Sequence, residues 1–201
     1  MKDPQTPARQ IRAEYDAETI TVYQAYDPHI AEPALAAQTF VAPFKRARMT
    51  WIKPSFLWMM YRCGWASKPG QARVLAIAIT REGFEWALAN SCGSTPAPGE
   101  TRETWKARLE SSPVRVQWDP ERDLHLNRLD HRSIQIGLSG EAVNRYVDEW
   151  ITGIEDMTST AHRIAEHLRT GDIDNAKALL PTERPYLLED PSQHRDLVEQ
   201  Q

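Results

Sequence analysis

Glycine, cysteine and long hydrophobic runs are all scarce in this sequence, and each shortage excludes a class of protein. The 201 residues include 9 glycines, which is too few for a collagen-like repeat. The 2 cysteines, Cys63 and Cys92, lie far apart and do not form the framework of a disulfide-rich scaffold. No apolar run approaches the roughly 18 residues that a membrane-spanning helix needs. We therefore expect a chain that folds around a hydrophobic core.

Features of a secreted or zinc-binding protein are missing as well. The first ten residues are polar, unlike the apolar core of a secretory signal. Neither cysteine belongs to a CxxC pair or has a histidine nearby, which favours free thiols in a reducing compartment over a zinc site. We therefore expect a cytoplasmic protein that has no contact with a membrane and no bound metal.

Common catalytic motifs are also missing. The sequence has no GxGxxG or Walker loop for phosphates, no HExxH for zinc, no EF-hand loop and no GxSxG serine motif. P-loop enzymes, zincins and serine hydrolases are therefore poor matches.

Acidic residues are missing from the stretch between Pro33 and Arg81, where only basic charges occur. This stretch carries eight basic residues, while the whole chain has a net charge of -4, so the remainder carries -12. A basic segment in an acidic protein indicates a face that binds an anion. The alternative is that folding pairs these cations with distant carboxylates. The eight are Lys45, Arg46, Arg48, Lys53, Arg62, Lys68, Arg73 and Arg81.

The hydrophobic pattern predicts a mixture of strands and helices. Alternating or continuous apolar runs predict strands at 19–26, 49–52, 73–80, 114–118 and 133–138. Helical spacing predicts helices at 29–40, 55–65, 81–90, 100–110, 139–154, 158–169 and 172–180, with Ser139 as an N-cap.

Strands and helices do not alternate strictly along the chain, and the later half is more helical. This order predicts an α+β fold, in which one mostly antiparallel sheet is flanked by helices and the C-terminal part is helical. We expect the strands at 19–26, 73–80, 114–118 and 133–138 to share that sheet. The predicted organisation is a flexible lead-in (1–8), a single globular domain (9–186) and a polar tail (187–201).

Residues 48–65, RMTWIKPSFLWMMYRCGW, mix cations with large aromatic side chains. Stacking a base beside a phosphate requires this combination. Trp51 and Tyr61 are the candidate stacking groups, and Arg48, Lys53 and Arg62 are the candidate anion-binding groups. The alternative is a buried helix whose cations extend to the surface.

Two strands carry polar side chains that are candidates for binding a ligand. Tyr23, Gln24 and Tyr26 lie at the end of the strand at 19–26. Gln135 points to the same side of its strand as Ser133, and a polar group on an inner face needs a partner or a ligand. The alternative for the first group is an edge strand whose tyrosines pack on the sheet.

Several segments resemble the family known as domain of unknown function 4291. They are RQIRAEYD (9–16), VYQAY (22–26), RMTWIKPSFLWMMYRCGWA (48–66), RVLAIAITREGFEWAL (73–88), VRVQWDPERD (114–123) and RSIQIGLSGEAVNRYVDEWI (132–151). The resemblance covers roughly residues 9 to 186. Because the family name states that its activity is not established, the resemblance implies little about function.

The order of polar strand end, aromatic segment, apolar strand and late strand also resembles the ADP-ribosyltransferase fold. This resemblance implies NAD as the ligand and gives the catalytic positions to Gln24 and Gln135. Both positions depart from the usual pattern, since Gln24 replaces a His or Arg and Gln135 replaces a catalytic Glu. An amide can orient a hydroxyl but is not a general base.

The NAD hypothesis assigns a role to each candidate residue. Trp51 or Tyr61 would stack on the nicotinamide, and the ribose hydroxyls would bond to Tyr23, Gln24 or Ser55, with Tyr26 beside them. The pyrophosphate would be neutralised by Arg48, Lys53 or Arg62.

The competing hypothesis is a nucleic-acid-binding module without catalysis. The same basic stretch would follow phosphates and the same indoles would stack on bases. An overall pI near 5.9 argues against a long duplex footprint. A third hypothesis is a helical interaction domain formed by residues 139–180.

Overall fold

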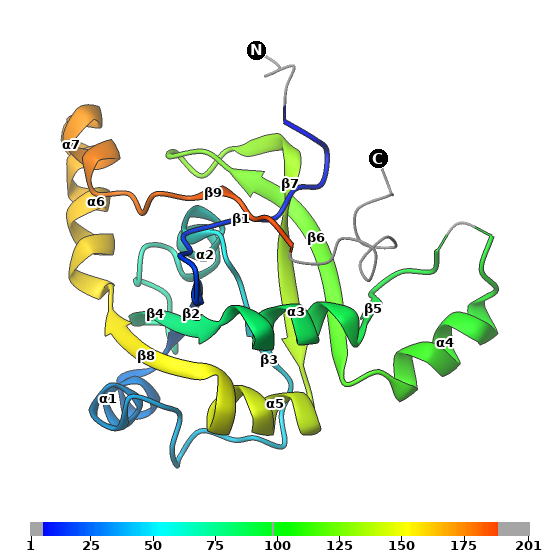
Figure 1. Cartoon of the computed structure of the whole chain (residues 1–201). Coiled ribbons are helices and arrows are strands. Elements are labelled where there is room, and N and C mark those ends of the chain that lie inside the picture. Colours follow the sequence, from blue (N-terminus) through cyan, green and yellow to red (C-terminus); the bar gives the residue numbers. More distant parts are fainter. Residues whose placement is uncertain (1–5, 98, 189–201) are drawn as a thin grey trace.

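Two sheets form the framework of the chain in a computed structural model, which describes residues 6–97 and 99–188 (Figure 1). The first sheet has the strand order β2-β4-β8, and both of its pairings are antiparallel. The second has the order β3-β7-β6-β5, in which only β5 and β6 are parallel. The predicted α+β class is therefore confirmed.

The strands that build these sheets are as follows. The first sheet contains β2 (Thr19–Tyr26), β4 (Arg73–Thr80) and β8 (Ile151–Asp156). The second contains β3 (Thr50–Ile52), β5 (Ser91–Gly93), β6 (Val114–Arg122) and β7 (Arg128–Leu138). A separate pair joins β1 (Arg12–Ala13) to β9 (Arg184–Pro185) near the two ends of the described chain.

The prediction that the four long strands share one sheet was wrong, because β2 and β4 lie in one sheet and β6 and β7 in the other. The two sheets meet where Tyr23 and Lys53 form an isolated bridge, with the Tyr23 N–H donating to the Lys53 carbonyl at 2.7 Å. Pro54 follows directly and has no N–H to donate, so the pairing does not extend.

Helices surround the two sheets. They are α1 (Pro28–Ala37), α2 (Phe56–Cys63), α3 (Arg81–Ala89), α4 (Arg102–Ser111), α5 (Glu141–Arg145), α6 (Thr158–Thr170) and α7 (Ile173–Ala178). A π-helical turn, Tyr146–Trp150, continues α5. Across the described ranges, none of the helices is both long and apolar enough to cross a membrane.

The predicted helix at 139–154 is shorter than its apolar spacing suggested. The helical part ends at Trp150, and Ile151 to Asp156 form β8, where Ile154 lies opposite Ile77 of β4. The open edge of β4 offers hydrogen bonds that outweigh the helical spacing. Ser139 is not the N-cap; its hydroxyl donates to the Pro113 carbonyl, and Gly140 takes the cap position.

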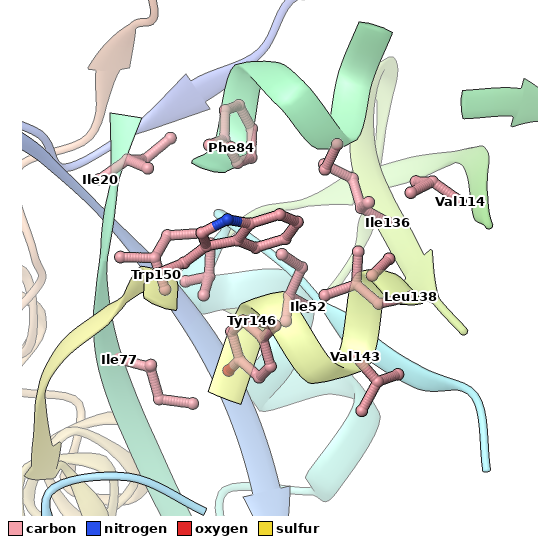
Figure 2. Packing of buried hydrophobic residues seen from close by; sticks show 14 of the residues in the cluster. Ile20, Ile52, Ile77, Phe84, Val114, Ile136, Leu138, Val143, Tyr146 and Trp150 are labelled. Carbon is pink, nitrogen blue, oxygen red and sulfur yellow. The ribbon is translucent and has the colours of Figure 1, made fainter. Parts of the chain in front are cut away.

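The main core lies between the sheets and α3, and Trp150 is at its centre. Figure 2 shows the indole of Trp150 among Phe84, Ile52 and Tyr146. Gly83 on α3 allows this packing, because a Cβ built there would lie 2.3 Å from Cγ of Trp150. Since Trp150 and β8 belong to this core and sheet, residues 139–180 do not form a separate unit.

Replacing Gly83 with alanine should destabilise the protein by about 3 kcal/mol, because the added methyl group overlaps a buried indole. The gain in helix propensity, about 1 kcal/mol, is too small to offset the overlap. Urea denaturation measures the difference. Glu82→Ala on the exposed side of α3 is the control, and equal stability of the two variants would contradict the packing described here.

The C-terminal part of the described chain crosses back to the start of α2. Arg12 donates to the Glu183 carbonyl at 3.3 Å, and the Tyr186 N–H donates to the Ile11 carbonyl at 2.8 Å. This crossing brings Glu183 to a site more than 120 residues earlier in the sequence, where its carboxylate accepts from the Phe56 N–H. The predicted lead-in and tail are only partly visible, since residues 1–5 and 189–201 lie outside the described residues.

Candidate functional site

Lys53 is buried directly after β3, although an ammonium group is normally exposed. Only 4% of the residue is exposed, and its Nζ lies 4.2 Å from the ring centroid of Trp58 and 5.8 Å from that of Trp51. Burial lowers the pKa of Lys53 to about 7; the negative charge of Asp119 opposes the shift and Arg62 adds to it. The amine is therefore poised to gain or lose a proton near neutral pH.

A chain of hydrogen bonds holds the Lys53 amine in place. Its Nζ donates to Oε1 of Gln135, and Nε2 of Gln135 donates to Oδ2 of Asp119. Gln117 donates to the other oxygen of Asp119 at 2.9 Å. The antiparallel register explains the arrangement, because Gln117 lies opposite Gln135 and Asp119 lies opposite Ser133 on β6 and β7.

Ser55 and Glu121 form a second polar group beside this chain. Ser55 is the N-cap of α2: its Oγ accepts from the Trp58 N–H at 3.1 Å and donates to Oε1 of Glu121 at 2.9 Å. Burial raises the pKa of Glu121, while hydrogen bonds from the Arg122 N–H, Ser55 and Ser133 oppose the shift. Three hydrogen-bond donors therefore hold the Glu121 carboxyl group in place on β6.

A pocket of about 240 Å³ opens between the start of α2, the β6–β7 hairpin and the C-terminal crossing segment. Two carboxyl groups face it, those of Glu121 and Glu183. Burial and the charge of Glu121 raise the pKa of Glu183 to about 8, against the hydrogen bond from the Phe56 N–H. The lining residues are Arg12, Ser55, Phe56, Leu57, Glu121, Arg122, Leu129, His131, Leu180, Pro181 and Glu183.

Four of the candidate residues from the sequence lie close together. Lys53 contacts Gln135 through a hydrogen bond and Trp51 through its ring, and Ser55 follows two residues later. The indole of Trp51 lies against Gly137, where a Cβ would approach the ring to 2.9 Å. Of the ten candidates, Ser55 lines the 240 Å³ pocket and the other nine lie outside its lining.

Three candidates on β2 point into the protein interior. Gln24 is 3% exposed; its amide donates to Tyr26, Thr50 and the Trp51 carbonyl. Its oxygen accepts from the Tyr146 hydroxyl at 2.8 Å. Tyr23 is also buried and packs edge-on against Phe56. The hydrogen bonds of Gln24 are therefore made within the protein.

The remaining three candidates lie on the surface. Tyr61 is 41% exposed, and the guanidinium of Arg122 stacks 3.5 Å from its ring centroid. Arg62 is exposed one residue later and acts electrostatically on Lys53. Arg48 is exposed in the loop before β3.

Part of the basic stretch is neutralised by ion pairs, as the alternative explanation anticipated. Arg46 pairs with Asp148, Arg73 with Glu32 and Asp156, and Arg81 with Glu85. Other cations of this stretch lie over aromatic rings: Nζ of Lys53 is 4.2 Å from the ring centroid of Trp58, and Nζ of Lys68 is 5.8 Å from that of Tyr61. Arg122 from β6 stacks on the same tyrosine.

Several residues of the site were missed in the sequence. Asp119 and Glu121 flank Pro120, which suggested the end of a strand, whereas β6 continues through a bulge to Arg122. The DPER run was a usable signal, since two carboxylates separated by one residue can share a strand face. Glu183 had no local signal, because only the chain crossing brings it to α2.

The two cysteines, Cys63 and Cys92, are both free and buried. In the part of the chain that the structure describes, no cluster of three or more His, Cys, Asp or Glu side chains could hold a metal ion.

The fold and site define an α+β protein in which the edges of two sheets meet at Tyr23 and Lys53. The buried lysine lies beside the rings of Trp51 and Trp58. The chain belongs to the family described as domain of unknown function, DUF4291, whose model matches residues 10–186. No curated protein matches the sequence.

Proposed function

We propose that the protein binds a nucleotide, NAD or a related one, on the surface around Lys53. The observation that carries the proposal is the Lys53 amine, which lies over Trp58 and near Trp51 and is oriented by Gln135. Every nucleotide carries an aromatic base and a phosphate joined through a sugar, and this surface offers a partner for the base and one for the phosphate.

The residues fit the parts of such a ligand. Tyr61 and Trp51 are partly exposed and suited to stacking on a base or a nicotinamide ring. Lys53, Arg62 and Arg122 supply positive charge for the phosphates. Asp119 keeps the Gln135 amide oriented with its oxygen towards Lys53.

ADP-ribosyl transfer is the catalytic form of this proposal. NAD, when bound, supplies a ribosyl carbon whose bond to nicotinamide is weakened by positive charge on the ring. Neither Gln24 nor Gln135 accepts a proton from an acceptor group, because an amide is not a base. Binding is therefore the function that the predicted residues support most directly.

Binding of a single-stranded nucleic acid is the second candidate. It is favoured by the exposed Arg62, which follows Tyr61 in sequence, and by the exposed Arg48 in the loop before β3. Against it, Arg46, Arg73 and Arg81 are paired with carboxylates. Fewer cations are then free to follow a phosphate backbone, which makes a nucleotide the better match.

Titration with NAD and with a short single-stranded RNA at 50 and 200 mM salt should separate the two candidates. If the protein contacts three phosphates of the RNA, its affinity for RNA should fall about 20-fold over this range, whereas its affinity for NAD should fall only a few-fold. Tighter, more salt-dependent binding of the RNA would make the protein a nucleic-acid-binding module. No binding of either would contradict both candidates.

Trp51→Ala should weaken nucleotide binding by about 1–3 kcal/mol if the indole stacks on the ligand ring. Trp105→Ala on α4 is the matched control and should leave the affinity unchanged, since its indole bonds to the Gly93 carbonyl. A lower melting temperature with unchanged affinity of the folded fraction would show that Trp51 is only part of the packing.

A further inference from the structure

The 240 Å³ pocket holds polar groups that the protein itself does not satisfy. Nε of Arg122 is buried and has no hydrogen-bond partner. One oxygen of Glu183 accepts from Phe56, while the other has no partner among the described residues. The His131 ring likewise makes no hydrogen bond within the described ranges. A buried donor without a partner is costly, so these groups indicate a polar ligand.

The charges around the pocket exclude strongly charged ligands. A cationic nitrogen would meet the guanidinium groups of Arg12 and Arg122. A phosphate would meet the carboxyl groups of Glu121 and Glu183, where burial already raises the pKa of Glu183 and the charge of Glu121 adds to the shift. A neutral ligand with hydroxyl groups avoids both conflicts, because each hydroxyl both donates and accepts.

The size and position of the pocket limit the range of possible ligands further. Pockets for whole drug-sized ligands have volumes of about 300–1,000 Å³, so a pocket of about 240 Å³ suits a single ring. Arg122 lines the pocket and also stacks on Tyr61. Leu57 of the pocket lies one helical turn before Tyr61, so the pocket adjoins the surface around Tyr61.

We propose that this pocket binds the ribose ring of the nucleotide, with its two adjacent hydroxyls bonding between the Glu183 carboxyl and Nε of Arg122. Phe56, Leu57 and Leu129 cover the apolar faces of the ring. This inference rests on the proposed nucleotide binding. It adds that the pocket determines which sugar is accepted, because it distinguishes ribose from deoxyribose.

Comparison of ADP with 2′-deoxy-ADP by calorimetry tests the inference without changing the protein. Loss of one hydroxyl leaves a buried group unpaired, so we expect deoxy-ADP to bind at least tenfold more weakly. If ADP and deoxy-ADP bind equally, the ribose assignment is wrong while nucleotide binding stands. D-ribose alone is the third ligand, because the same hydroxyls occur on a free sugar.

Glu183→Gln tests the protein side, since glutamine retains an oxygen for the Phe56 N–H but loses the second carboxyl oxygen. The preference for ADP over deoxy-ADP should fall to about twofold, and Glu110→Gln on the exposed side of α4 should retain it. An unchanged preference in Glu183→Gln would overturn the inference. If D-ribose binds in a Glu183-dependent way but no nucleotide does, the pocket is a sugar site and the proposed function fails; if none binds, both fail.

Discussion

Replacing Lys53 with methionine should stabilise the protein by about 2–3 kcal/mol at pH 7 while weakening nucleotide binding roughly hundredfold. Lowering the pKa of Lys53 from 10.5 to about 7 corresponds to roughly 4–5 kcal/mol of unfavourable charge burial. Lys53→Met removes this cost, but part of the gain in stability is lost because Oε1 of Gln135 no longer accepts a hydrogen bond from the Lys53 amine. The loss of affinity corresponds to a charge-assisted hydrogen bond to phosphate.

The difference in stability between Lys53→Met and the unsubstituted protein should depend on pH through the titration of Lys53. Its folded pKa lies below its unfolded pKa, so the cost is complete below pH 7 and disappears as the pH rises towards 10.5. The stability advantage of Lys53→Met should therefore be largest at pH 6.5 and shrink steadily by pH 9.5. Urea denaturation of both proteins measures it, and subtracting the two curves removes the separate titration of Glu183.

The nucleotide affinity of the unsubstituted protein should depend on the protonation of Lys53. An anion favours the protonated amine, so affinity should be highest below pH 7 and fall by up to tenfold per unit above it. Lys45→Met in the exposed loop before β3 is the control for loss of one positive charge. If both lysine variants bind equally well and show the same stability, the role given to Lys53 is wrong.

Gln24→Leu should be the most destabilising of these changes, with a loss of about 4 kcal/mol or more. The amide bonds to Tyr26, Thr50, the Trp51 carbonyl and Tyr146, and all four partners would lose a hydrogen bond. Each buried group left without a partner costs about 1–3 kcal/mol. The network is enclosed, so water does not replace the lost bonds easily.

Gln135→Leu is the matched comparison, because it makes the same substitution in a half-buried glutamine. We expect it to cost less stability than Gln24→Leu but to weaken nucleotide binding, since it releases the Lys53 amine. Denaturation and calorimetry on both variants give the comparison. A small stability loss and a large affinity loss for Gln24→Leu would instead place Gln24 at the ligand, as the ADP-ribosyltransferase resemblance implies.

The sequence determined most of the local structure. The apolar run at 73–80 is β4, in the centre of its sheet, and Ser55 and Pro54 set the start of α2 at Phe56. These features depend on side-chain spacing and capping, which act over a few residues. The segment around Trp51 and Lys53 was recognisable for the same reason, because its cations and aromatic rings are adjacent in sequence.

Only the tertiary structure decided how these elements meet. It split the strands into two sheets, buried Gln24 and paired Arg46, Arg73 and Arg81 with carboxylates. It also carried Glu183 to the Phe56 N–H, 127 residues away in sequence, and so completed the pocket. Local patterns contain no information about such pairings, because their free energy arises from burial and charge that exist only after distant segments pack together.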